Sequence, residues 1–180
     1  MTVWVLLLRG INVGGTGKLP MKDLKAHMEA LGAEAPETYI QSGNAVFAGA
    51  IEPEAFAADL TARIEANHGH APRILVVPGD DMIASRDAFP FPGGLERPKF
   101  ANIWFCAETP AAPDLGRLDD LATDTERFAL KGRWFFLDAP DGIGRSKLAE
   151  RVEKALGVPA TARNMNTVNK LCEMVQARQA

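Results

Sequence analysis

The order of elements predicts an α+β protein built from two ferredoxin-like (βαββαβ) subdomains packed together, with an extra C-terminal helix. Short apolar runs of strand length alternate with apolar residues at helical spacing. They give the order strand, helix, strand, strand, helix, strand, and this order recurs after a segment rich in Pro and Gly. No residue-level repeat accompanies the recurrence, so a single mixed sheet is the alternative.

The first subdomain spans residues 1–88. Its opening strand is the apolar run 3–9, and a helix follows that begins near Met21 and ends at Gly32. The remaining elements, in order, are strands at 37–41 and 45–48 joined by a tight turn around Ser42–Asn44, a helix at 53–67, a strand at 73–77 and a connecting helix at 78–88.

A linker at 89–98, "FPFPGGLERP", separates the two subdomains because its Pro and Gly density interrupts regular structure. The second subdomain spans residues 99–180. Its elements, in order, are a strand at 99–107, a helix at 112–122, a hairpin of strands 127–130 and 133–138, a helix at 146–156, a strand at 159–163 and a final helix at 164–178.

The loop after the first strand, "RGINVGGTGKL", places four glycines between Arg9 and Lys18. It does not match a P-loop, because Asn12 stands where the first glycine is needed and Leu19 follows the lysine. It does not match the dinucleotide-binding glycine pattern either, because Pro20 stands where the third glycine is needed. Glycines nevertheless let backbone N–H groups converge on an anion, and the loop runs into a helix N-terminus. We predict an anion site here, the alternative being a loop that only tolerates unusual dihedral angles.

Three other stretches are rich in polar side chains, and each has a structural alternative. In "DGIGRSKLAER", Ser146 is placed to cap a helix. Lys147 would then lie in the first helical turn, where a positive charge is unfavourable, and this indicates a bound anion or a chance surface lysine. In "TARNMNTVNKL", polar groups exceed what one helix cap needs, so the stretch either braces a loop or faces a ligand. In "YIQSGNAVF", turn chemistry alone explains the polar residues.

Charge is distributed unevenly along the chain, whose formal net charge is −3. Residues 1–25 hold four basic and one acidic side chain, and residues 141–180 hold seven and four, whereas the middle holds nine and eighteen. If the fold brings the two basic ends together, they form a positive patch that attracts an anionic partner. Solvated helix faces are the alternative explanation.

The sequence contains few candidate catalytic residues. The three histidines lie outside the polar stretches, and the two cysteines, Cys106 and Cys172, lack metal spacing and are expected to be packed thiols. No metal site is predicted. Phosphoryl or nucleotidyl transfer, which runs on positioning and positive charge, stays an alternative to binding, although Asp141 is the one motif carboxylate that could hold magnesium.

RNA binding is the alternative from another class, because ferredoxin-like sheets include RNA-recognition modules. The stretch "KGRWFFLD" meets three of the seven positions of the aromatic RNA signature, so Trp104, Phe105, Trp134 and Phe136 are expected to pack in the interior.

The apolar run 3–8 is too short to span a membrane and lacks the features of a signal peptide. A cytoplasmic location without membrane partners is therefore expected.

The polar stretches also carry a family resemblance. "LLRGINVGG", "KLPM", "TYIQSGNAVF", "PDGIGRSKL" and "TARNMNTVNKL" resemble, in this order and over nearly the whole chain, the bacterial domain of unknown function 1697 family. The resemblance implies two ferredoxin-like subdomains, and it implies no reaction and no cofactor. Met165 departs from the family, which usually has a tryptophan or another bulky apolar residue there.

These observations together predict a small phosphorylated or nucleotide-like anion bound at the interface of the two subdomains. They indicate neither a cofactor nor an oligomeric state, and they leave open whether a reaction follows binding. The predicted ligand-binding residues are Arg9, Asn12, Gly14, Gly15, Lys18, Gln41, Ser42, Asn44, Ser146, Lys147, Arg163, Asn164 and Thr167.

Overall fold

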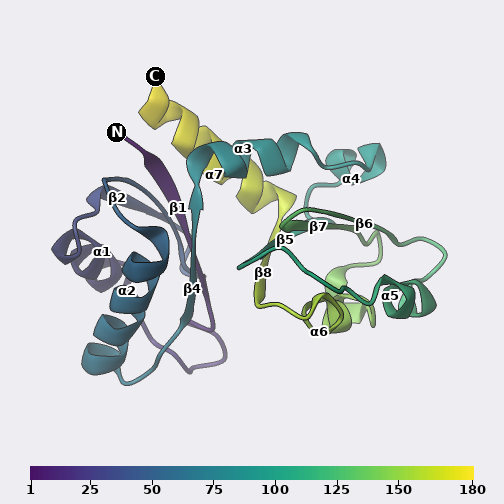
Figure 1. The fold of residues 1–180 in the computed structure, drawn as a ribbon, viewed down its shortest axis with the longest axis horizontal. Coiled ribbons are helices and arrows are strands. Elements are labelled where there is room, and N and C mark those ends of the chain that lie inside the picture. Colours follow the sequence, from purple (N-terminus) through teal and green to yellow (C-terminus); the bar gives the residue numbers. More distant parts are fainter. The chain divides into compact units, whose positions relative to one another are not determined.

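The apolar run near the N-terminus forms a central strand, β1 (Val3–Arg9), of a four-stranded antiparallel sheet (Figure 1). The structure is a computed structural model that describes residues 1–180. The chain divides into two units. The first comprises Met1–Ala84 with Lys170–Ala180, and the second comprises Ser85–Asn169.

The first unit has the predicted βαββαβ order. Its elements after β1 are α1 (Met21–Ala30), β2 (Glu34–Tyr39), β3 (Asn44–Ala48), α2 (Pro53–His68) and β4 (Arg73–Pro78). The strands are arranged β2-β3-β1-β4, and every neighbouring pair is antiparallel. This is the ferredoxin-like arrangement, so the predicted fold class of this half is confirmed.

Alternating residues of β1 build the core of the first unit. Leu6 and Leu8 are buried with Phe47 and with residues of α1 and α2, which cover one face of the sheet (Figure 1). Phe47 stacks on Phe56 with ring centroids 5.0 Å apart. Burial of each such side chain stabilises the fold by about 1.5–3 kcal/mol.

Parts of two helices outside the repeated order complete the first unit. Helix α3 (Gly79–Asp87) follows β4, and the C-terminal part of α7 (Met165–Gln179) packs near its start. A Cβ atom on Gly79 would lie 2.7 Å from Val175 Cγ1, so a glycine is needed for this close approach. Gln179 donates to Asp80 Oδ1 at 2.8 Å. Helix α7 therefore contributes to both units, whereas all of it was predicted to belong to the second subdomain.

The second unit repeats the same arrangement. Its elements are α4 (Pro92–Glu96), β5 (Ala101–Cys106), α5 (Leu115–Leu121), β6 (Arg127–Lys131), β7 (Trp134–Asp138), α6 (Val152–Leu156) and β8 (Ala160–Asn164). The strands are arranged β6-β7-β5-β8, again fully antiparallel. The prediction of two ferredoxin-like halves is confirmed, and the single mixed sheet is wrong.

Two elements of the second unit differ from the prediction. The expected helix at 146–156 is shorter, because 3₁₀ turns at Ile143–Arg145 and Ala149–Arg151 precede α6. The predicted linker contains α4, which begins at Pro92, a residue favoured at the first position of a helix.

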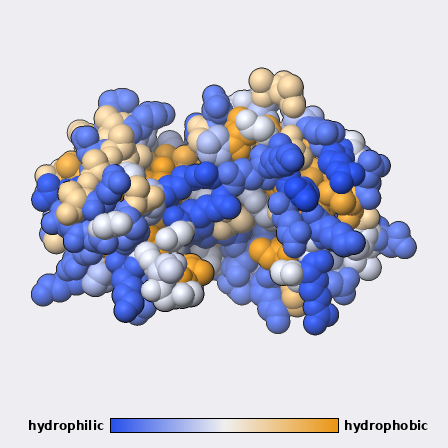
Figure 2. All heavy atoms as spheres, turned by 90° about the horizontal axis from the view of Figure 1, so that it is seen from below, coloured by the Kyte–Doolittle hydropathy of each residue, from blue (hydrophilic) through white to orange (hydrophobic).

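The aromatic residues of the second unit pack in its interior, as expected. Trp104, Phe105 and Phe136 are buried, Trp134 is half-buried, and Trp104 contacts Phe135 edge to face at 5.7 Å between ring centroids. Hydrophilic residues cover most of the visible surface of each unit, interrupted by scattered hydrophobic ones (Figure 2). None of the helices has both the length and the hydrophobicity needed to cross a lipid bilayer.

A pair of histidines joins the two helices of the first unit. His27 Nε2 of α1 lies 3.0 Å from His68 Nε2 of α2, and the rings meet edge to face. Burial lowers the pKa of His27, and the neighbouring His68 and Arg63 lower it further, against the opposing effect of Asp23. The hydrogen bond between the rings needs one of them neutral.

This pair predicts a loss of stability in mild acid. The pKa of His27 is lower in the folded than in the unfolded protein, so the unfolded state binds more protons as the pH falls below about 6.5. The contribution of His27 to the free energy of unfolding is therefore fully present above that pH and is lost progressively below it. Urea unfolding at pH 7.5 and 5.5 should show this decline, and it should be smaller in His27→Gln. An unchanged pH dependence in the variant would contradict the assignment.

Candidate functional site

The loop between β1 and α1 is held in shape by Asn12. Its Nδ2 donates to Leu19 O at 3.0 Å and to Gln41 O at 2.8 Å, and its Oδ1 accepts from Leu19 N at 2.9 Å. The backbone of Asn12 is left-handed, with φ of 52°, a conformation that asparagine tolerates better than most residues. The predicted ligand residue Asn12 thus braces the loop and ties it to the turn between β2 and β3.

The tip of this loop is a tight turn with exposed amides. Thr16 N donates to Val13 O at 3.1 Å, and both residues between them, Gly14 and Gly15, have positive φ, 59° and 78°. The amide groups of the two glycines are exposed and donate to no acceptor in the protein. Adjacent amides of this kind can converge on an anion.

The turn between β2 and β3 contains the residues of "YIQSGNAVF". It consists of residues 40–43 instead of the predicted 42–44, and it includes Ile40, with φ of 50°, and Gly43, with φ of 88°. A β-branched residue in the left-handed region is strained, and such strain concentrates at functional positions. Asn44 is buried and donates to Tyr39 O and Ser42 Oγ, whereas Gln41 and Ser42 are exposed.

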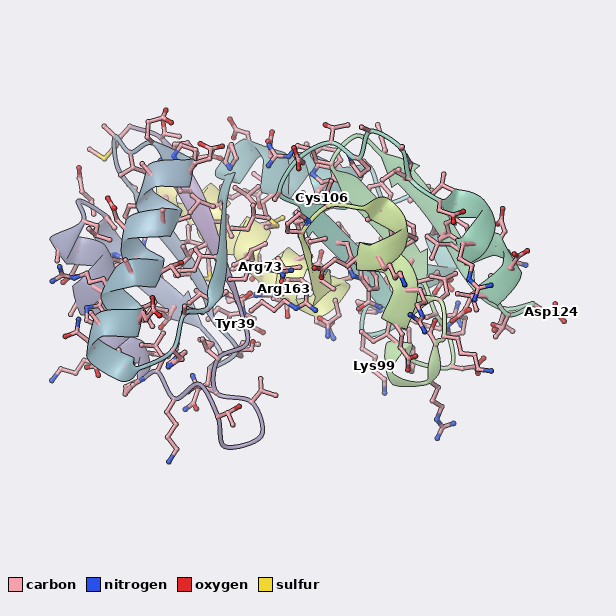
Figure 3. The ribbon with its side chains drawn as sticks, turned by 60° about the horizontal axis from the view of Figure 1, so that its bottom comes forward. Tyr39, Arg73, Lys99, Cys106, Asp124 and Arg163 are labelled. Atoms are coloured by element: carbon pink, nitrogen blue, oxygen red, sulfur yellow. The ribbon has the colours of Figure 1, made fainter.

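Two exposed cations belong to this end of the first unit. Arg9 ends β1, and Lys18 follows the loop tip. Lys18 makes no ion pair. Strand pairing places Arg73 of β4 directly opposite Arg9, so both arginines lie on the same side of the sheet (Figure 3 labels Arg73). Arg73 was not among the predicted residues, because only the register of β1 with β4 reveals the pair.

In the second unit, the stretch at 146–147 combines a buried serine and an exposed cation. Ser146 is buried, and its Oγ accepts from Ala149 N at 3.0 Å, at the start of the 3₁₀ turn Ala149–Arg151. It does not cap a helix that begins at 146, because α6 begins only at Val152. Lys147 is exposed. Ser146 therefore has a structural role, and Lys147 stays a predicted ligand residue.

The stretch after α6 is largely braced from within. Arg163 lies on β8, and its Nη1 donates to Thr161 Oγ1 at 2.9 Å and to Ala162 O at 2.8 Å (Figure 3 labels Arg163). Burial lowers the pKa of Arg163 to about 10. Asn164 Oδ1 accepts from the amide of the buried Thr167 at 3.0 Å, which is the bond of a helix N-cap.

The thirteen predicted residues thus fall into groups according to whether their side chains make hydrogen bonds within the protein or are exposed to solvent. Side chains that brace the fold are Asn12, Asn44, Ser146, Arg163 and Asn164. Residues exposed to solvent are Arg9, Gly14, Gly15, Lys18, Gln41, Ser42 and Lys147. Thr167 is buried at the start of α7. Ligand binding by the exposed group stays a prediction.

Nucleophilic chemistry finds little support among the titratable groups. Cys106 and Cys172 are buried free thiols, as predicted, and burial raises the pKa of Cys106 to about 11. A thiol with this pKa is protonated at neutral pH and is a weak nucleophile. No group of three or more His, Cys, Asp or Glu side chains is arranged to hold a metal ion.

Comparisons with known proteins agree with the resemblance in the sequence. The family model described as "Protein of unknown function (DUF1697)" matches residues 1–136, which include the loop after β1 and the turn between β2 and β3. The chain is also similar to the solved structure of the conserved bacterial protein SP0830 from Streptococcus pneumoniae. That match has 25% sequence identity and a TM-score of 0.63, and it covers 97% of this chain and 98% of the other. The search of curated proteins returned no match. Because the family model spans well over half of the sequence, the chain belongs to the protein family of unknown function DUF1697.

Proposed function

We propose that the loop between β1 and α1 binds a small phosphorylated or nucleotide-like anion. Lys18 would supply the charge, and the amides of Gly14 and Gly15 would donate to the phosphate oxygens. The observation that carries the proposal is the pair of adjacent exposed amides without acceptors, on a loop that also presents a lysine without an ion pair.

The bracing by Asn12 supports the proposal, because a loop that is ordered in advance loses less entropy when it binds a ligand. Three hydrogen bonds of one side chain fix both sides of the loop. Binding rather than turnover is proposed, since neither the loop nor the turn to which Asn12 ties it contains a carboxylate that could hold magnesium.

Lys18→Gln should weaken binding of pyrophosphate about tenfold, because it removes one charge-assisted contact. Isothermal titration calorimetry with pyrophosphate and a mononucleotide measures the effect. Lys22→Gln is the matched control, since Lys22 is an exposed lysine of the neighbouring helix α1 and makes no ion pair. Equal affinities of the two variants, or no saturable binding by the wild type, would refute the proposal.

A third variant, Lys147→Gln, measures the contribution of the second unit. If Lys147 contacts the same anion as Lys18, Lys147→Gln should itself weaken binding, and the effect of the double substitution should differ from the product of the two separate effects. If its charge acts elsewhere, Lys147→Gln should leave the affinity unchanged. Single-stranded RNA in the same titration tests the alternative class, for which affinity falls steeply with salt.

A further inference from the structure

The second unit contains a cavity that was not predicted from the sequence. It has a volume of about 310 Å³ and lies where α5 meets α6. Its lining consists of Asp114, Arg117, Arg151, Lys154 and Ala155. This volume is within the range of small-molecule sites.

Three cations line this cavity, and none of them is neutralised by the protein. The side chains of Arg117, Arg151 and Lys154 are exposed and make no ion pair or hydrogen bond. Arg151 ends the 3₁₀ turn before α6, and Lys154 lies three residues further on within α6, so two like charges lie close together and repel each other. The arrangement therefore raises the free energy of the unliganded protein.

Nearby carboxylates do not relieve this repulsion. Glu150 stands four residues before Lys154, a spacing that favours an ion pair along a helix, yet the two form none. Asp114 is the only acid in the lining, and its Oδ1 accepts from Arg117 N at 3.0 Å as the N-cap of α5. The lining thus keeps a net charge of about +2 at neutral pH.

The backbone beneath the cavity is fixed. Asp114 N donates to Ala155 O at 2.8 Å, which ties the start of α5 to α6. Leu118 and Val152, from the same two helices, are fully buried in the core of this unit. The positions from which the three cations project are therefore held together before any ligand arrives.

We propose that this cavity is a second anion site, which binds a small molecule carrying a phosphate monoester. A phosphate monoester has a charge of about −1.5 to −2 at pH 7, which matches the charge of the lining. Arginine and lysine side chains bind phosphate through charge-assisted hydrogen bonds. The site is separate from the loop of the first unit and does not depend on the function proposed for that loop.

The test is a titration of isotope-labelled protein with glycerol 3-phosphate, followed through the amide signals of the second unit. Saturable shifts should appear at residues 114–117 and 151–155. Arg151→Gln and Lys154→Gln should each weaken binding about tenfold. Lys131→Gln, which removes an exposed lysine at the β6–β7 turn, should leave the affinity unchanged.

Two further arms make the result decisive. Binding should weaken from pH 7 to pH 5, because the phosphate monoester loses its second negative charge near pH 6, and glycerol should not bind. Shifts scattered over the surface, or equal affinities of Lys131→Gln and Arg151→Gln, would overturn the proposal. Signals of Gly14 and Gly15 report the loop of the first unit separately, so either site can fail without the other.

Discussion

Gly43→Ala should lower the free energy of unfolding by about 2–5 kcal/mol, from backbone strain and overpacking together. Gly43 has φ of 88°, in the left-handed region. An added Cβ would lie 2.7 Å from Leu8 Cβ and 2.8 Å from Ile11 Cδ1, and both neighbours are buried. The backbone also has little freedom to move away, because Gly43 O accepts from Leu8 N at 2.8 Å.

Two matched glycines separate the causes. Gly132 has φ of 57° but open space around its Cβ position, so Gly132→Ala should cost only the backbone strain, about 1–2 kcal/mol. Gly144 has neither positive φ nor a close neighbour, and Gly144→Ala should leave stability within about 0.5 kcal/mol of the wild type or raise it slightly. Urea unfolding of the three variants gives the comparison, and equal values for Gly43→Ala and Gly132→Ala would contradict the packing argument.

The same substitution should also disturb the proposed anion loop. Ile11 belongs to that loop, and Gly43 belongs to the turn to which Asn12 is hydrogen-bonded through Gln41 O. A displaced Ile11 would shift the loop that carries Gly14, Gly15 and Lys18. If the proposed function is correct, the affinity of Gly43→Ala for pyrophosphate should fall even where the variant remains folded.

Most of the fold could be predicted from the sequence, because the apolar spacing reports directly which faces are buried. Phe56, Leu60 and Ile64 recur at helical spacing, and all three are in the core. The division of α7 between the two units could not be predicted in this way. Its apolar residues show that the helix is buried, whereas the close approach of Val175 to Gly79 depends on three-dimensional contacts.

The candidate site was less predictable, because residue type does not reveal whether a polar group is already used. Asn12 and Asn164 look like ligand residues in the sequence, yet the side-chain oxygen of each accepts a hydrogen bond from a backbone amide. The bracing role of Asn12 could have been suspected, since asparagine side chains commonly hydrogen-bond to nearby backbone groups in loops and turns. The cations of the α5–α6 cavity come from segments 34 residues apart, Arg117 and Arg151, and no local pattern joins them.

Arg163→Lys should lower the free energy of unfolding by about 1–3 kcal/mol in the absence of any ligand. The guanidinium group donates to Thr161 Oγ1 and Ala162 O through one nitrogen, Nη1. Burial disfavours its charged form, as the lowering of its pKa to about 10 shows, yet the group remains charged at neutral pH. Lysine would keep this charge in place with a shorter, differently shaped donor, so the cost of burial would persist while hydrogen bonds are lost.

The control for this variant is Arg145→Lys, because Arg145 is exposed and its side chain makes no hydrogen bond. Its stability should match that of the wild type within about 0.5 kcal/mol. Urea unfolding and pyrophosphate titration of both variants separate scaffold from ligand contact. If Arg163 is scaffold, Arg163→Lys loses stability without ligand. If it instead matches Arg145→Lys in stability and binds pyrophosphate more weakly, the guanidinium contacts the anion, and the internal hydrogen bonds only orient it for that purpose.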